Sequence, residues 1–271
     1  MSALRLKLRA RVPERIDMRG VVPDKLRGLS LNEIGALMLP AGKSRRRLDE
    51  YFELSGKNPG ELTFTGATEC LDYIGAEMSG GRISVEGGAG DYLAKDMHAG
   101  EIHVRGTAGV YAATGMRAGL VRIDGDAGDF LGGPIPGGRH GLRGGTVVVR
   151  GRAGDRTGER QRRGQILIEG DAGDYLGARM LAGSIVVLGR AARHAGFAMR
   201  RGTLLLTQAP ASQSPTFNET GRHQLGFLKL LLLGLRDVGG AFADLDATRT
   251  DVRRWVGDRA CGGKGEILIR S

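Results

Sequence analysis

The chain has 271 residues, of which 47 are glycine, and a formal net charge of +10 at pH 7. The glycines recur at a regular spacing much longer than that of collagen, which excludes a collagen-like chain and a low-complexity linker. Of the 40 basic side chains, 33 are arginine, so the charge favours attraction to carboxylate or phosphate groups.

No segment predicts a membrane span or a signal peptide. The longest apolar run, residues 227–235, is too short to cross a bilayer and contains Lys229. Residues 1–15 alternate charged and apolar side chains instead of forming an apolar core. We therefore expect a soluble, cytoplasmic protein.

Residues 1–58 predict a small α+β segment. Residues 4–12 alternate apolar and basic side chains, which is typical of a half-buried strand. Ser30 and Glu33 form a capping-box pattern that predicts a short helix running to Pro40. A basic loop then leads to a second strand at residues 51–54. We expect this segment to cap one end of the repeats that follow it.

Residues 59–207 contain a sequence repeat of fixed period. Regular copies begin at Gly81, Gly100, Gly119, Gly145, Gly164 and Gly183, and the clearest one reads GQILIEGDAGDYLGARMLA. The interval from Gly119 to Gly145 is longer than the others because extra residues are inserted within 132–139. A fixed period of about 20 residues is typical of a solenoid, in which each coil buries its apolar face against its neighbours.

Each copy predicts one short strand followed by tight corners. Positions 3 and 5 are aliphatic, whereas positions 2, 4 and 6 are mostly polar. Position 7 is always Gly and position 9 always Ala, which predicts positive φ or a close backbone approach. Aromatic residues at position 12 and methionines at position 17 predict two more inward columns. The fold class is therefore mainly β, a single-stranded parallel β-helix in which one repeat forms one coil.

Residues 208–271 break the repeat and predict a cap at the second end. Residues 221–238 are typical of an apolar helix that covers the stack, and residues 265–270 return to strand spacing. The expected architecture is a β-helix with an N-terminal α+β cap and a C-terminal helical cap.

The residue pattern predicts neither an active site nor a metal site in this chain. Aspartates recur at position 11, but Val110 and Arg193 interrupt the column, which favours hydrogen bonding in turns over calcium binding. The histidines form no ligand motif. Cys70 and Cys261 match no metal spacing, and we interpret both as buried free thiols.

One column is basic. Position 18 is occupied in succession by His98, Arg117, Arg143, Arg162 and Arg200, with Leu181 as the one exception. Stacked strands are about 4.8 Å apart, and like charges at that spacing repel each other. Either the column is a solvated basic edge, or it forms a track for a polyanion or a docking face for an acidic subunit. The absence of interleaved aromatic residues in the column disfavours nucleic acid.

The repeat and its flanks resemble the C subunit of formylmethanofuran dehydrogenase over nearly the whole chain. The resemblance is carried by LSLNEIGALMLPAG, YFELSG, GDAGDYLGARMLAGSIVVLG and RRWVGDRACGGKGEILI. The coil alone is also similar to the C-terminal domain of the glutamate synthase large subunit. Archaeal members of the family belong to tungsten or molybdenum complexes that reduce CO₂. The arginine bias favours the related bacterial formyltransferase/hydrolase complex, which moves a formyl group from formyl-tetrahydromethanopterin to a methanofuran-type carrier and releases formate.

The resemblance implies that catalysis and the metal reside on sister subunits. These are an amidohydrolase-like A subunit, a B subunit and a formyltransferase D subunit, so this chain is expected to bind no cofactor alone. The carrier of the family has a glutamate-rich tail, which gives the basic column a candidate ligand. We therefore interpret the chain as a scaffold subunit in one-carbon metabolism whose position-18 residues guide that tail. The alternatives are the C subunit of a dehydrogenase and a β-helix module for another polyanion.

Overall fold

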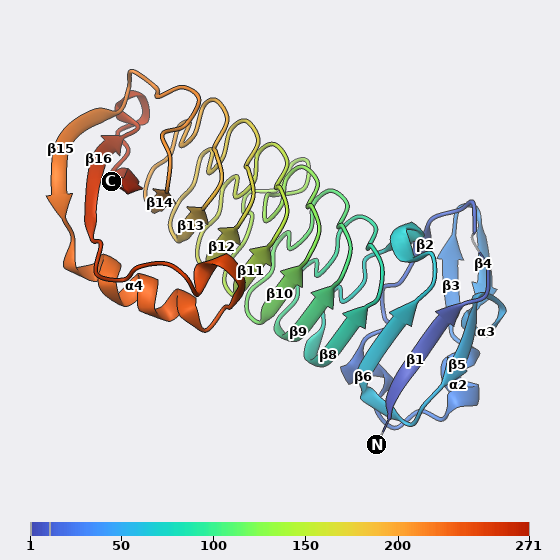
Figure 1. Ribbon diagram of the computed structural model, residues 1–271. Coiled ribbons are helices and arrows are strands. Elements are labelled where there is room, and N and C mark those ends of the chain that lie inside the picture. Colours follow the sequence, from blue (N-terminus) through green and yellow to red (C-terminus); the bar gives the residue numbers. More distant parts are fainter. Residues whose placement is uncertain (1, 11, 271) are drawn as a thin grey trace.

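The computed structural model describes residues 2–10 and 12–270 and shows a long stack of coils with the chain ends at opposite ends (Figure 1). The strands and helices in chain order are β1 (Ala3–Leu8), β2 (Ile16–Asp17), α1 (Pro23–Leu26), α2 (Leu31–Gly35), β3 (Met38–Ala41), β4 (Ser44–Arg47), α3 (Leu48–Tyr51), β5 (Phe52–Ser55), β6 (Asn58–Thr65), η1 (Thr68–Cys70), β7 (Leu71–Asp72), β8 (Ser79–Val85), β9 (Ala99–Val104), β10 (Leu120–Ile123), β11 (Thr146–Val149), β12 (Gln165–Ile168), β13 (Ser184–Val187), β14 (Thr203–Leu206), β15 (Asn218–Gln224), α4 (Gly226–Arg236), η2 (Gly240–Phe242), β16 (Asp251–Gly257), η3 (Arg259–Cys261) and β17 (Gly265–Arg270). No helix in these two ranges has the length and apolar character that a membrane crossing requires.

A 13-stranded sheet runs the length of the stack, in the order β15-β16-β17-β14-β13-β12-β11-β10-β9-β8-β6-β1-β5. From β6 to β14 every neighbouring pair is parallel, and equivalent residues of successive repeats lie opposite each other, as with Val147 and Ile166. The aliphatic residues at positions 3 and 5 are fully buried. The prediction of a mainly β chain with one parallel strand in each coil is confirmed.

Two of the predicted inward columns form the interior. The alanines at position 9 are buried and pair coil to coil, from Ala89 and Ala108 to Ala172 and Ala191. The residues at position 17 are also buried, including Gln161 in place of methionine. At position 7 a Cβ on Gly125 would lie 2.8 Å from the carbonyl of Gly106. Close approach of neighbouring coils therefore requires this glycine.

The N-terminal segment joins the same sheet. Strand β1 pairs in parallel with β6 and antiparallel with β5, and it ends at Leu8 rather than at residue 12. The capping box of Ser30 and Glu33 is confirmed, but α2 ends at Gly35 instead of reaching Pro40. Residues Met38–Ala41 form β3 because they pair with β4 in a hairpin.

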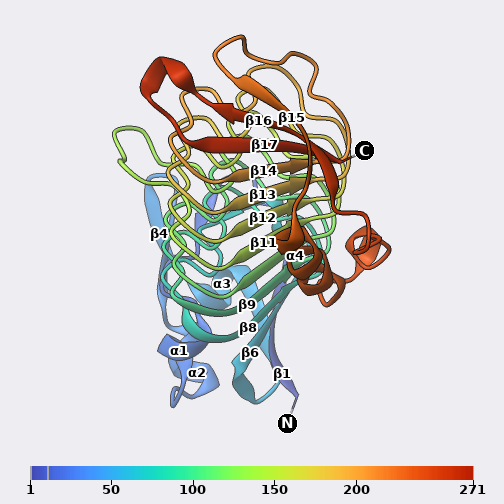
Figure 2. The same ribbon diagram turned by 90° about the vertical axis from the view of Figure 1, so that its left-hand side faces the viewer.

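The C-terminal helix differs from the prediction in length and position. Residues 218–224 form strand β15, so α4 begins only at Gly226. The helix lies along the outer face of the sheet (Figure 2), where Leu228 and Leu232 pack on an apolar row. That row is the position-4 column of β11 to β14, which consists of Val148, Leu167, Val186 and Leu205.

The position-4 column explains where α4 lies. In earlier coils this position is polar and half-buried, with Ser84, His103 and Arg122. Arg122 donates a hydrogen bond at 2.7 Å to the carbonyl of Val238, just beyond the end of α4. From Val148 onward the position is apolar, and its burial requires a cover. The second end of the stack, which the sequence predicts to be covered by the helix, is occupied by strand β17. This strand pairs in parallel with β14.

Candidate binding surface

The structure brings the five predicted site residues into one column along a corner of the stack. The N–H of Arg117 donates to the carbonyl of Met97, and the N–H of Arg143 donates to that of Met116, both at 2.8 Å. The N–H of Arg200 donates in the same way to the carbonyl of Met180 at 2.9 Å. Position 18 is therefore held by a ladder of backbone hydrogen bonds, which continues through Leu181.

The side chains of the column are accessible. His98, Arg117, Arg162 and Arg200 are exposed, and Arg143 is half-buried. Within residues 2–10 and 12–270, none of these five side chains forms an ion pair or a hydrogen bond. The positive charge of the four arginines is therefore not compensated by an ion pair within these ranges, and the column can attract an external anion.

The insertion at residues 132–139 projects as a green loop in Figure 2 and places one arginine, Arg139, beside Arg143 of the column. His140 follows it, and partial burial lowers the pKa of this imidazole. The positive charges of Arg162, Arg143, Arg139 and Arg160 lower the pKa further. The guanidinium groups near His140 therefore disfavour protonation of its imidazole.

The aromatic residues at position 12 do not lie in the core, and the prediction of an inward aromatic column is wrong. Tyr73, Tyr92, Tyr111 and Phe130 stack with ring centroids 4.7, 5.4 and 4.8 Å apart, but the side chains are only half-buried. A φ near +60° at Tyr92 and Tyr111 turns these side chains outward. The next residue of each coil, such as Leu131, is buried in their place.

Arg156 continues this aromatic ladder where the repeat lacks a ring. Its guanidinium lies 5.8 Å from the ring centroid of Phe130 and 4.9 Å from that of Tyr175. It also pairs with the buried carboxylate of Glu159, which a second guanidinium, that of Arg179, contacts at 2.8 Å. The sequence signal for this cluster is the high density of arginine between residues 139 and 163.

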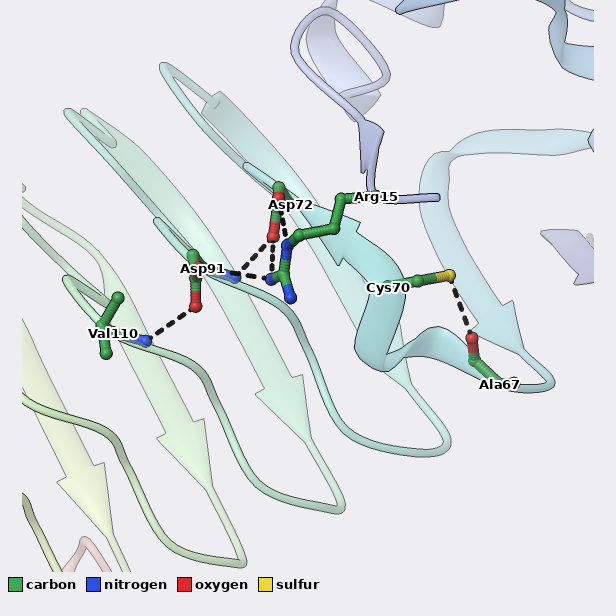
Figure 3. Close-up of polar contacts among 6 residues, drawn as sticks. All are labelled: Arg15, Ala67, Cys70, Asp72, Asp91 and Val110. Carbon is green, nitrogen blue, oxygen red and sulfur yellow. Dashed lines mark hydrogen bonds and ion pairs between the residues drawn. The ribbon is translucent and has the colours of Figure 1, made fainter. Parts of the chain in front are cut away.

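The aspartates at position 11 bond successive coils (Figure 3), as the turn interpretation predicts. A carboxylate oxygen of Asp72 accepts the N–H of Asp91 at 2.7 Å, and a carboxylate oxygen of Asp91 accepts the N–H of Val110 at 3.0 Å. Arg15 from the N-terminal segment closes the ladder by donating to Asp72. These carboxylates are therefore occupied by backbone and arginine donors.

The described residues contain no group of three or more His, Cys, Asp or Glu side chains arranged to hold a metal ion. Cys70 and Cys261 are free thiols, but both are half-buried rather than fully buried. The Cys70 thiol lies 3.4 Å from the carbonyl oxygen of Ala67, and burial raises its pKa.

One of the solved structures to which this chain is similar matches it over almost its whole length. A chain in the X-ray crystal structure of the formyltransferase/hydrolase complex from Methylorubrum extorquens, solved in complex with methylofuran, matches 98% of this chain and 99% of its own length. The TM-score is 0.92 and the sequence identity is 41%.

Shorter stretches match curated proteins. Over 85 residues the chain is 42% identical to the C subunit of the Methylorubrum extorquens formyltransferase/hydrolase complex. Over 92 residues it is 30% identical to the C subunit of the tungsten-containing formylmethanofuran dehydrogenase 2 of Methanococcus maripaludis. These matches span 32% and 34% of the two relatives, about a third of their length. No protein-family model matches the chain.

Proposed function

The chain belongs to the family of formylmethanofuran dehydrogenase C subunits, and on that premise we propose that it is the C subunit of a formyltransferase/hydrolase complex. The observation that carries this proposal is the 41% identity over 98% of the chain with a structure of such a complex. The complex would transfer a formyl group from formyl-tetrahydromethanopterin to a methanofuran-type carrier and release formate.

Affinity purification of the tagged full-length chain from its native host tests this assignment. We expect the A, B and D subunits to co-purify, together with formyltransferase activity. Recovery of the chain alone would contradict the proposal. The second candidate, the C subunit of a tungsten or molybdenum dehydrogenase, is favoured by the 30% identity to a methanococcal relative. Metal analysis of the purified complex distinguishes the two, because only the dehydrogenase contains tungsten or molybdenum.

Within the complex, we propose that the chain is a non-catalytic scaffold. Residues 59–207 would form a single-stranded parallel β-helix of the glutamate synthase type, and residues 1–58 and 208–271 would cover its ends. Support comes from the in-register strands and the paired alanines of successive coils. It also comes from the pairing of β1 with β6 and of β17 with β14. Such a stack holds surface residues at a fixed spacing.

We propose, finally, that the position-18 column holds or guides the acidic tail of the carrier between active sites on sister subunits. Support comes from its exposure, its uncompensated charge and the regular spacing of His98, Arg117, Arg143, Arg162 and Arg200. A chain of carboxylates has repeated charges of the opposite sign, so successive guanidiniums can each pair with it.

Kinetics of the intact complex test the column. Replacing Arg117, Arg143, Arg162 and Arg200 by Ala should raise the apparent KM for the long-tailed carrier about five- to tenfold, since each exposed ion pair contributes little. The salt dependence of KM should also flatten. The control variant Arg27→Ala removes an exposed arginine of the N-terminal segment, outside the column. An equal rise in KM for a carrier without the tail would refute the proposal that the column guides the tail. An unchanged KM for the long-tailed carrier would also refute it and would leave only the scaffold role.

A further inference from the structure

A hollow of about 420 Å³ lies between the 132–139 insertion and the ladder of aromatic rings. Its walls come from three places in the sequence, namely the ring residues Tyr111 and Phe130, the insertion from Pro134 to Arg139, and the segment Arg156, Glu159 and Arg160. This volume lies within the range of small-molecule sites. None of the five residues of the position-18 column lines this hollow, but Arg139 and Arg160 also line a neighbouring hollow with Arg200, so the hollow adjoins the column.

One wall of the hollow is apolar and aromatic. Tyr111 and Phe130 stack on each other, and Arg156 lies over the other face of Phe130, so the ring edges are left to face the hollow. Pro134 and Ile135 of the insertion form the opposite side. Ring edges carry partial positive charge and pack well against the face of another aromatic ring. This wall therefore fits a planar aromatic group.

The other wall is basic and only partly neutralised. Arg139 is exposed and Arg160 is half-buried, and neither has an ion-pair partner within residues 2–10 and 12–270. Glu159 also lines the hollow, but its carboxylate is already paired with Arg156 and Arg179. Two guanidinium groups thus remain available, and guanidinium pairs bidentately with anionic oxygens such as those of carboxylates.

We propose that this hollow is a binding site for a small organic dianion in which two carboxylates are attached to an aromatic ring. The ring packs against the edges of Tyr111 and Phe130, and the carboxylates pair with Arg139 and Arg160. This inference does not rest on the proposed function, because it uses neither the position-18 column nor the acidic tail.

Isothermal titration calorimetry of the full-length chain with two matched probes tests the site. Isophthalate carries two carboxylates on a benzene ring, and glutarate carries two carboxylates separated by the same number of carbon atoms without a ring. We expect isophthalate to bind about tenfold more tightly than glutarate, since edge-to-face contacts of an aromatic ring contribute up to about that order of affinity. Equal affinity for the two probes, or no binding of isophthalate, would overturn the proposal.

Variants locate the site. Arg139→Gln and Arg160→Gln should each weaken isophthalate about tenfold, and Phe130→Leu should weaken isophthalate while leaving glutarate unchanged. Arg27→Gln, at a distant exposed arginine, should change neither probe. Arg117→Gln in the column should also have no effect, so failure of the tail proposal would not affect this result. Undiminished isophthalate binding in both arginine variants, with circular dichroism unchanged, would contradict the site.

Discussion

Single residues at the corners of the stack act mainly on the neighbouring coil. Asp174 accepts the N–H of Arg193 and also pairs with its guanidinium, both at 2.9 Å. These contacts lower the pKa of the Asp174 carboxyl, the guanidinium hydrogen bond having the largest effect. The position-11 pattern indicated such bonds in the sequence, because an aspartate that recurs beside glycine is typical of a turn.

Asp174→Asn should lower Tm by about 1–2 °C at pH 7, because the ion pair with Arg193 is exposed. The carboxyl pKa is lower in the folded chain than in the unfolded chain. Its stabilisation is therefore complete above the ordinary aspartate pKa of about 4 and is lost as the pH falls through the lowered value. Thermal unfolding from pH 7 to pH 2 should show the difference shrinking towards zero. Asp244→Asn, an exposed aspartate without ladder contacts, should show no such trend.

At the scale of the element, α4 is held by one face only. Leu228, Leu232 and Leu235 are buried against the sheet, whereas Leu230 is 74% exposed. The sequence predicts a helix over residues 221–238, and the change of position 4 from Arg122 to Val148 marks where the surface that the helix covers begins. Together, the apolar helix and the apolar position-4 residues indicate that the helix packs on the face of the sheet.

Leu232→Ala should lower the free energy of unfolding by about 2–5 kcal/mol, because it leaves a cavity between the helix and the sheet. Leu230→Ala makes the same chemical change on the exposed side of the helix and should change stability by less than about 0.5 kcal/mol. Urea denaturation of both variants gives the comparison. Equal losses would mean that α4 does not pack on the position-4 column.

At the scale of the whole molecule, one sheet joins segments that are distant in sequence. Strand β17 at the C-terminus pairs with β14 on one side and with β16 on the other, and its residues Ile267 and Leu268 are fully buried. The end of the parallel stack is therefore covered by strands, which satisfy the backbone groups of β14. An uncovered parallel edge of this kind is a template for pairing with another chain.

A chain that ends after Lys264 should lose stability and self-associate, because it lacks β17 and leaves the edge of β14 unpaired. Size-exclusion chromatography with light scattering should show a mass that rises with concentration more steeply than for the full chain. Ile267→Ala is the control, since it should cost about 2–5 kcal/mol but retain the strand. Identical mass profiles for the truncated and full chains would argue against β17 as the cover.

The sequence by itself determined the period, the inward aliphatic, alanine and methionine columns, the glycine corners and the basic position-18 column. These features depend on contacts between residues one coil apart, so they repeat in the sequence as they repeat in space. The tertiary structure alone decided the position of α4, the insertion of β17, the outward turn of Tyr92 and Tyr111, and the hollow at residues 132–139. The helix, β17 and the hollow depend on contacts made once in the molecule, and such contacts leave no period in the sequence. The outward turn does recur at position 12, but an aromatic residue at that position does not by itself reveal the positive φ that turns it outward.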